Sequence, residues 1–115
     1  MIRVYVMYPF SAGCRFDFDY YANTHMPLCW RLLREHGLTG TFVGRGIDGG
    51  APGVPPQYVC VGGMEFTSQH DYHRGVKRHG AELQADFPNY TDIKPIMVIT
   101  ETDTTLLPAG GSKAG

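Results

Sequence analysis

The chain has 115 residues, enough for one domain with a single modest core. Its formal net charge is -1 at pH 7, and its basic residues are scattered apart from a cluster of Arg74, Lys77 and Arg78. This size excludes a cofactor domain beside a separate substrate domain. The charge pattern gives no footprint for nucleic acid or for an anionic membrane surface.

The start of the sequence lacks the basic region, apolar run and cleavage site of a secretory signal, and no apolar stretch approaches the length of a membrane span. The three cysteines, Cys14, Cys29 and Cys60, are odd in number and far apart. This spacing favours neither a disulfide framework nor a zinc site with paired cysteines. We therefore expect reduced thiols in a cytoplasmic protein.

Residues 2–8 alternate in the period-two pattern of a β-strand. A turn at 11–13 leads into a predicted helix over residues 17–36. Asp17 is placed to cap the start of this helix, because its carboxylate can accept from a free backbone N–H one turn on. Gly37 is placed to end it.

Two further strands are predicted over residues 39–47 and 57–66, separated by a glycine- and proline-rich loop at 48–56. A hairpin loop of this length is a lid, a partner contact or an idle surface loop. Residues 44–49 match the pattern GxGxxG. Dinucleotide binding needs a helix that opens directly after the glycines, and this match runs into prolines instead, so we reject a dinucleotide site.

A second helix is predicted to begin after Ser68, because Ser68 and Asp71 resemble a capping box. Pro88 ends this helix. The last strand is predicted over residues 93–101, where Pro95 suits a strand end or an edge position.

This βαββαβ order predicts an α+β protein of the ferredoxin-like type, with a four-stranded antiparallel sheet and both helices on one face. We expect residues 1–102 to form the domain and residues 103–115 to form a flexible tail. No internal repeat stands out beyond the similarity of the two βαβ halves.

The predicted strands carry apolar residues on both faces, including Val59, Val61, Ile96 and Val98. In a monomer the face turned away from the helices would remain in contact with water. We therefore expect a homodimer packed sheet to sheet, forming a dimeric α+β barrel.

His25 is the leading candidate for function. It lies four residues after Tyr21 and four before Cys29, and so shares the apolar stripe of the first helix. Pro27 removes a backbone donor and disfavours helical geometry at Met26, and a kink there would free backbone groups beside the imidazole. The alternative is a core histidine satisfied by a backbone carbonyl.

His79 lies on the apolar stripe of the second helix, where Tyr72, Val76, His79 and Leu83 follow at steps of four, three and four. If both helices pack on the same face of the sheet, His79 and His25 converge. Imidazole titrates near neutrality and exchanges protons with carbon acids and enols, and burial lowers its pKa, which favours the neutral form that can accept a proton. The pair therefore predicts acid–base chemistry.

Other side chains near the two histidines are candidates for ligand contact. Tyr21, one turn before His25, is placed to orient the ring or to stabilise a developing enolate oxygen. Tyr72, Tyr90 and Cys29 are expected to contact the ligand, with ordinary core roles as the alternative. Cys29 and Cys60 could act as nucleophiles only with an activating base nearby, and we expect both to be buried, inert thiols.

No metal or cofactor site is predicted. His70 and His73 are one helical turn apart, but the sequence places no third ligand beside them, so we expect a solvated pair. The sequence also lacks the GxSxG, HExxH and P-loop patterns.

Two motifs resemble those of a known family. In the first, FDYY at 18–21 leads into HMPL at 25–28, and in the second, HGAEL at 79–83 leads into DFPNYTDIKP at 86–95. The chain resembles the EthD family of dimeric α+β barrel proteins, named for ethyl tert-butyl ether degradation, from residue 2 to about residue 102. The resemblance implies a ferredoxin-like homodimer with a cavity between helices and sheet, often without a metal or an organic cofactor.

Relatives and fold neighbours of that family include a methylmuconolactone isomerase, polyketide-ring cyclases and decarboxylases, cofactor-free quinone-forming monooxygenases, and members with no assigned chemistry. The resemblance implies that His25 is the catalytic or ligand-binding position, with His79 second. The loop at 48–56 is distinctive here and bears on the shape of the pocket mouth.

We therefore hypothesise cofactor-independent cyclisation, isomerisation or decarboxylation of a small enolisable aromatic, polyketide or lactone ligand. His25 would be the general acid/base, His79 its partner and Tyr21 the orienting hydroxyl. The alternatives are a non-catalytic accessory or ligand-binding subunit of an oxidative degradation pathway, and a cofactor-free monooxygenase. All three need a dry cavity with few polar groups, so the sequence does not choose among them.

Overall fold

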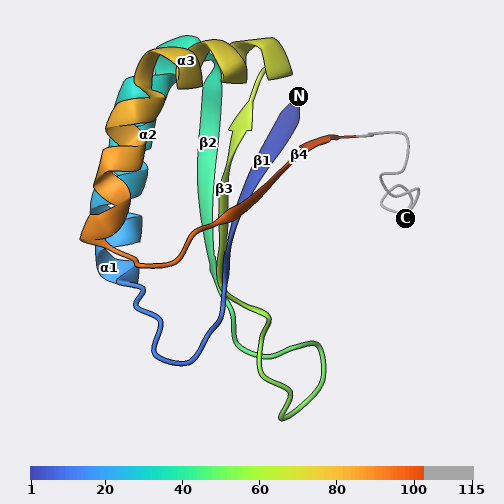
Figure 1. Cartoon of the computed structure of the whole chain (residues 1–115). Coiled ribbons are helices and arrows are strands. Elements are labelled where there is room, and N and C mark those ends of the chain that lie inside the picture. Colours follow the sequence, from blue (N-terminus) through green and yellow to red (C-terminus); the bar gives the residue numbers. More distant parts are fainter. Residues whose placement is uncertain (103–115) are drawn as a thin grey trace, which may run out of the picture.

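The computed structural model of the chain describes residues 1–102, and the predicted tail at 103–115 lies outside the described residues. The predicted βαββαβ order is confirmed (Figure 1). In chain order the elements are β1 (Ile2–Pro9), α1 (Phe18–Tyr20), η1 (Tyr21–His25), α2 (Met26–Leu33), η2 (Arg34–His36), β2 (Leu38–Arg45), β3 (Tyr58–Phe66), α3 (Gln69–Asp86), η3 (Phe87–Asn89) and β4 (Ile96–Glu101). The segment η1 is a π-helical turn, whereas η2 and η3 are 3-10 turns.

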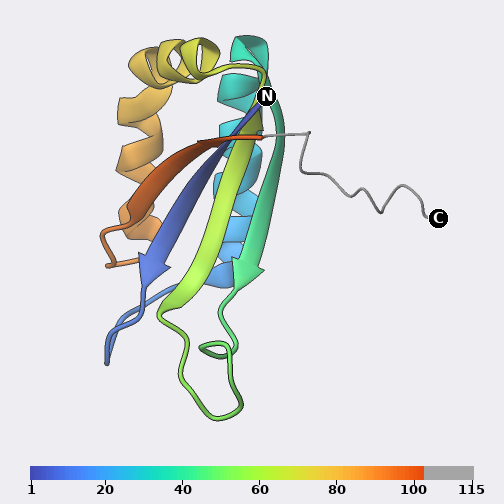
Figure 2. The ribbon, with the colours of Figure 1, turned by 90° about the vertical axis from the view of Figure 1, so that its right-hand side faces the viewer.

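The four strands form one antiparallel sheet in the order β2-β3-β1-β4 (Figure 2). Both helical segments cover the same face of this sheet, as the ferredoxin-like prediction requires (Figure 1). In the register, Val4 of β1 lies between Met64 of β3 and Ile99 of β4. None of the described helices has the length and apolar character needed to cross a membrane.

The core lies between the sheet and the helices. Alternate residues of β1 are buried there, because successive side chains of a strand point to opposite faces. The helices contribute Met26, Cys29 and Leu33 from α2, and Tyr72 and Leu83 from α3. The site described below is built into this core rather than added to the surface.

The first helical segment begins and ends as predicted. The Asp17 side chain accepts a hydrogen bond from the backbone N–H of Tyr20 at 3.0 Å. Gly37 follows η2 in the left-handed conformation, with φ of 93°, which glycine adopts without a steric penalty.

The expected loss of helical geometry at Met26 does not occur. Met26 is helical, with φ of -64° and ψ of -41°, and its N–H bonds to the carbonyl of Tyr21, five residues back. The chain accommodates Pro27 by widening one turn into the π-helical segment η1, which places Pro27 in the first turn of α2, where its missing N–H costs least. His25 is the last residue of that widened turn.

The second half of the chain also follows the predicted boundaries closely. Ser68 caps α3 by accepting from the N–H of Asp71 at 3.0 Å. Strand β4 begins three residues later than predicted, because the N–H of Ile93 bonds to the Thr91 side chain and Pro95 has no N–H to give to a ladder. As expected for a strand next to a proline, β4 lies at an edge of the sheet.

Three of the four predicted apolar residues, Val61, Ile96 and Val98, lie on the sheet face turned away from the helices. Ile96 and Val98 are 49% and 44% exposed, and they pair with Met7 and Tyr5 of β1. Val61 is half-buried and pairs with Met7 on the same face, whereas the half-buried Val59 packs against the core. This apolar face supports the expected sheet-to-sheet dimer, which stays a prediction.

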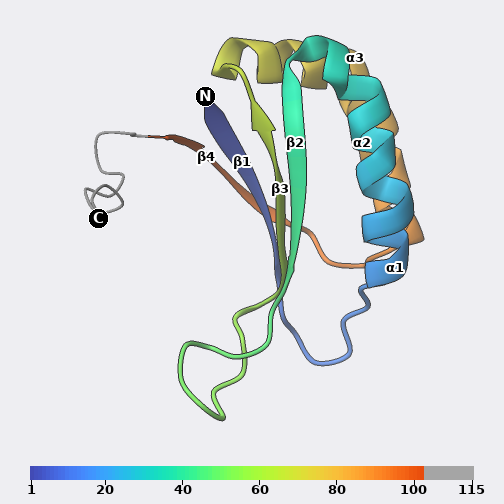
Figure 3. The ribbon, with the colours of Figure 1, turned by 180° about the vertical axis from the view of Figure 1, so that it is seen from behind.

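The loop at 48–56 extends from the end of the sheet on the side away from the helices (Figures 1 and 3). Ile47 at its base is 83% exposed, and Val54 is 46% exposed. No residue of this loop lines the cavity described below, so it is not a lid in this conformation.

Candidate functional site

A cavity of about 460 Å³ lies between the helices and the sheet. Its volume is in the range of small-molecule sites, and its wall is mostly apolar. The apolar part of the wall includes Val6, Met26, Leu33, Met64, Val76 and Leu83. Its wall contains few polar side chains, and the buried His25 is one of them.

His25 forms a hydrogen bond with a carboxylate from the other helix. Its side chain is 6% exposed, and its Nδ1 lies 2.8 Å from Oδ2 of Asp86, the last residue of α3. With Asp86 ionised, Nδ1 must carry the proton in this hydrogen bond. The other ring nitrogen of the neutral imidazole, Nε2, is then a proton acceptor.

Asp86 is held by two further donors. The Tyr20 hydroxyl donates to Oδ1 of Asp86 at 2.6 Å, and the Asn89 amide donates to the same oxygen at 2.9 Å. Burial opposes ionisation, but the hydrogen bonds from Tyr20, Asn89 and His25 outweigh it and hold the pKa of Asp86 below its ordinary value. Asp86 is therefore a carboxylate at neutral pH, with its second oxygen left for His25.

The pKa of His25 is lowered from its ordinary value of 6.5. Burial is the main cause, because it disfavours the charged imidazolium, and the nearby Asp86 carboxylate opposes the shift without cancelling it. The imidazole is therefore neutral at pH 7 and able to accept a proton.

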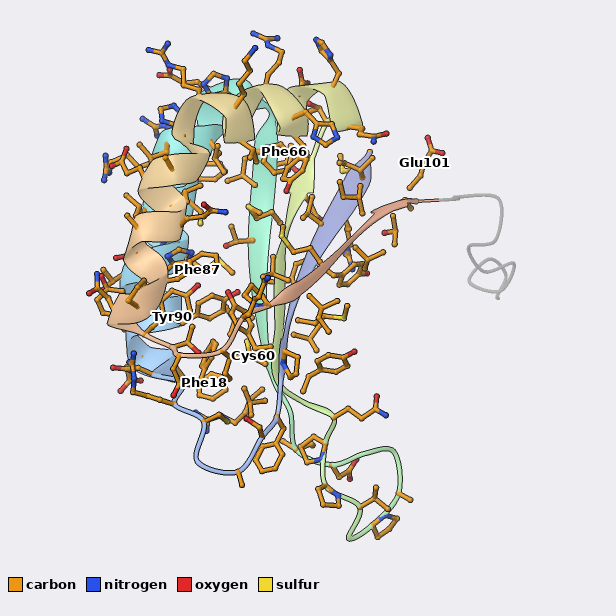
Figure 4. The ribbon with its side chains drawn as sticks, in the orientation of Figure 1. Phe18, Cys60, Phe66, Phe87, Tyr90 and Glu101 are labelled. Atoms are coloured by element: carbon orange, nitrogen blue, oxygen red, sulfur yellow. The ribbon has the colours of Figure 1, made fainter. Side chains whose placement is uncertain are left out.

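A cluster of aromatic rings surrounds the imidazole. Tyr21 stacks on His25 with an angle of 14° between the ring planes, and the Tyr90 ring centroid lies 4.7 Å from that of His25. Figure 4 shows Phe87 and Tyr90 at the end of α3, with their rings between that helix and the sheet. These contacts fix the plane of the imidazole, so its acceptor nitrogen has one direction.

Three phenols of this cluster lie close together. The hydroxyls of Tyr8 and Tyr90 are 2.8 Å apart, and Tyr21 is a further neighbour of Tyr8. Burial raises the pKa of Tyr8 to about 12, and it also raises the pKa of Tyr21 and of Tyr90 above their ordinary value. These hydroxyls therefore stay protonated and act as hydrogen-bond donors.

Gly62 of β3 makes room for the Tyr21 phenol. An added Cβ at Gly62 would collide with the Tyr21 hydroxyl and would lie 3.0 Å from two of its ring carbons. The absence of a side chain on this strand therefore lets the phenol rest against the sheet backbone.

The other expected ligand contacts are only partly in the cavity wall. Tyr72 and Cys29 line the cavity, whereas Tyr90 does not and reaches it only through its bond to Tyr8. Burial raises the pKa of the Cys29 thiol to about 12, so this thiol is protonated and a poor nucleophile at neutral pH.

The expected convergence of His25 and His79 does not occur. His79 is half-buried, but it does not line the cavity. Its ring packs edge to face against His36 of η2, with the ring centroids 5.3 Å apart.

The reason lies in the two edges of the apolar stripe of α3. Gly75, one turn before His79, faces the first helical segment, where an added Cβ would lie 2.9 Å from Leu33 and 3.1 Å from His36. His79 continues this edge of the helix, whereas Gly80 belongs to the edge that faces the cavity. Periodicity identifies the stripe but not which neighbour each edge meets.

Asp86, Tyr20, Asn89 and Tyr8 complete the site. The sequence indicates Asp86 only as a further polar group near the second helix, with an ordinary surface role as the alternative, and it gives the other three no role. Asp86 and Asn89 are three residues apart, a spacing that permits their contact, and both lie within the second motif at 86–95. No local pattern could pair either with His25, because 61 residues separate His25 from Asp86. Within residues 1–102 no group of three or more histidine, cysteine or acidic side chains is arranged to hold a metal ion.

Several solved structures are similar to this chain. An EthD-like protein from Ralstonia eutropha JMP134 is 35% identical, with a TM-score of 0.84, over 94% of this chain and 95% of that one. An EthD family protein from Bacillus halodurans C-125 is 19% identical, with a TM-score of 0.61, over 90% and 99% of the two chains. A DABB family protein with a ferredoxin-like fold from Mesorhizobium loti MAFF303099 is 18% identical, with a TM-score of 0.55, over 88% and 95%. The last two likenesses concern the fold alone.

No family model matches the chain, and no curated protein matches it.

Proposed function

This chain belongs to the EthD family, and from that premise we propose that its cavity carries out cofactor-independent acid–base chemistry on a small enolisable ligand. The ligand is aromatic, a polyketide or a lactone, and the reaction is a cyclisation, an isomerisation or a decarboxylation. The observation that carries this proposal is that His25 lines a ligand-sized apolar cavity and forms a hydrogen bond with the Asp86 carboxylate. A buried imidazole paired with a carboxylate is an arrangement suited to general base catalysis.

In the proposed step, the neutral Nε2 of His25 takes a proton from a carbon next to a carbonyl group. The C–H bond breaks, and its electron pair becomes the enolate. Asp86 stabilises the imidazolium that forms, because its carboxylate already bonds to Nδ1. The imidazolium then returns the proton at a second position, which isomerises the ligand, or gives it to the oxygen formed when the enolate carbon closes a ring.

The phenol of Tyr21 is the proposed donor to the enolate oxygen. Its raised pKa keeps the proton on the phenol, so it stabilises the developing charge by a hydrogen bond and does not lose the proton. Tyr72 and Cys29 contact the apolar part of the ligand. In this proposal Asp86 takes the place of partner that the sequence pattern gave to His79.

We also propose that the protein is a homodimer packed sheet to sheet. The exposed Ile96 and Val98 on the free face of the sheet support this arrangement, because apolar side chains on one face gain stability when a second sheet covers them. The unpaired thiols of Cys14, Cys29 and Cys60 are consistent with a reducing compartment such as the cytoplasm.

The test is a thermal-shift panel of lactones, phenolic polyketides and quinones, followed by turnover assays of each compound that binds. With a turned-over compound, His25→Gln should lower kcat/KM by about 10²–10⁴-fold. His70→Gln is the matched control, since His70 is exposed on α3 outside the cavity, and it should retain wild-type turnover. Unchanged turnover in His25→Gln would reject the proposal.

The same panel separates the alternative functions. A ligand that binds and is recovered unchanged favours a binding or accessory subunit. Dioxygen consumption in an oxygen electrode favours a cofactor-free monooxygenase. Either result would contradict proton transfer as the reaction of this cavity.

A further inference from the structure

Lys94 is the only side chain in the lining of the cavity that is charged at pH 7, as far as residues 1–102 define it. We infer that the ligand carries a carboxylate, and that Lys94 binds this group at the cavity mouth. The inference rests on the proposed function only in taking the cavity as the ligand site.

Lys94 lies where the cavity meets solvent. Its side chain is exposed, yet it lines both the cavity and a smaller hollow beside it. Gln84 of α3 and Met97 of β4 are also exposed residues of the cavity lining. The opening is therefore bounded by α3 on one side and by the segment that enters β4 on the other.

The backbone of Lys94 is held on both sides. The buried Thr91 donates its hydroxyl proton to the carbonyl of Arg15 at 2.8 Å and accepts from the N–H of Ile93 at 3.0 Å. Pro95 follows directly and restricts Lys94 to extended geometry. The Cα of Lys94 therefore has a fixed position at the cavity mouth, from which the flexible aliphatic stem can bring the ammonium group to a ligand there.

In the described part of the chain no carboxylate forms an ion pair with this ammonium group. None of the ion pairs formed within residues 1–102 involves Lys94, and no acidic residue lines the cavity. Asp92 lines the neighbouring hollow, but one of its oxygens accepts from the backbone N–H of Arg15 at 2.9 Å. Asp86 is occupied by His25 and its other donors.

A cation beside a largely apolar cavity favours an anionic ligand, because the field of the cation is less screened there than in open water. A carboxylate at Lys94 would leave the ring of the ligand among the apolar side chains of the interior. The ligand would then enter in one orientation, with its uncharged end toward His25.

The test compares 1-hydroxy-2-naphthoate with its methyl ester, two phenolic aromatic compounds that differ in the negative charge. Binding is measured by fluorescence titration, without any turnover. The wild-type protein should bind the acid more tightly than the ester. Lys94→Met should lower the affinity for the acid by about tenfold and leave the affinity for the ester within about twofold of the wild-type value.

Two further variants make the comparison specific. Lys94→Arg keeps the charge and should retain most of the preference for the acid. Lys77→Met removes a lysine that is exposed on α3 outside the cavity, and it should bind both compounds as the wild type does. If Lys77→Met lowered the affinity for the acid as much as Lys94→Met does, the effect would be a general one of charge, and the inference would be overturned.

The inference is also overturned if the wild type binds the ester as tightly as the acid, if it binds neither, or if Lys94→Met weakens both equally. These outcomes are independent of the reaction. If the Lys94 effect is found while no compound is turned over, the anion site stands and the proposed chemistry fails.

Discussion

Nδ1 of His25 lies 2.8 Å from Oδ2 of Asp86, and the two residues come from different helical segments. The direction of the imidazole therefore depends on how the end of α3 packs against η1. Because Tyr20 and Asn89 hold the other oxygen of Asp86, the carboxylate cannot turn away without breaking two more hydrogen bonds. The direction of the His25 imidazole is therefore set by contacts within this group of four residues.

Asp86→Asn should separate this positioning role from simple structural support. An amide can donate to Nδ1 and so favour the wrong imidazole tautomer, and we expect kcat/KM to fall by about 10²-fold or more for any ligand that is turned over. The carboxylate also raises the pKa of His25 against the effect of burial. Its removal should therefore move the acidic limb of the pH profile of kcat/KM to lower pH.

The pH profile is the decisive measurement for that variant. A merely destabilised protein would lose activity without a shift of the acidic limb. A limb at the wild-type position would contradict the role given to Asp86. Circular dichroism at the assay temperature checks that the variant is folded.

The same two groups predict how stability depends on pH. The folded-state pKa of His25 lies below its ordinary value of 6.5, so the unfolded chain binds more protons as the pH falls past 6.5. The free energy of unfolding should therefore decrease from about pH 6.5 downward, until the pH is below the folded pKa of His25. The free energy of unfolding should decrease again as the pH falls past 3.8, the ordinary pKa of an aspartate, because the pKa of Asp86 is also lowered in the folded state.

Urea unfolding from pH 8 to pH 5 measures the first of these losses. His25→Gln has no imidazole at this position, so its stability should change less than that of the wild type between pH 7 and pH 5. Parallel pH curves for the two proteins would show that His25 does not contribute to the effect.

The local features of the fold could be predicted from sequence because their causes are local. Asp17, Ser68 and Gly37 act within one turn of the helix ends that they define, so residue type and position were enough. Pro27 was recognised as a disturbance, but whether a helix kinks or widens depends on its packing, and here it widens.

The site could be predicted only in part, because its contacts join distant segments. The apolar stripes of the two helices predict that His25 and His79 both face the interior, so they do not distinguish the two histidines. The difference between them arises from tertiary packing, in which one edge of α3 meets the cavity and the other meets η2. The contact with Asp86 depends on the same packing.

His79→Gln tests this distinction directly. Because His79 packs against His36 and does not line the cavity, we expect its replacement to leave kcat/KM and ligand affinity within about twofold of the wild type. The comparison uses the same ligand and conditions as for His25→Gln. A loss near that of His25→Gln would restore His79 as a partner in the reaction and contradict the placement described above.

Gly62 provides a test of the packing beneath the site. In Gly62→Ala the new Cβ would collide with the Tyr21 phenol, so we expect the free energy of unfolding to fall by about 1–3 kcal/mol, as for overpacked cores. Gly40→Ala is the matched control on β2, since its Cβ would meet only the end of the Glu65 side chain, at 3.7 Å. It should change stability by no more than about 0.5 kcal/mol. Urea unfolding at pH 7 measures both.

The double variant Gly62→Ala with Tyr21→Phe identifies the cause of that loss. Removal of the phenolic oxygen takes away the closest atom in the collision, so the double variant should be more stable than the sum of the two single effects predicts. Additive effects would mean that the strain lies elsewhere in β3. A positive coupling would show that the loss in Gly62→Ala arises from the collision with the Tyr21 phenol, so that the bare backbone of Gly62 makes room for this side chain beside His25.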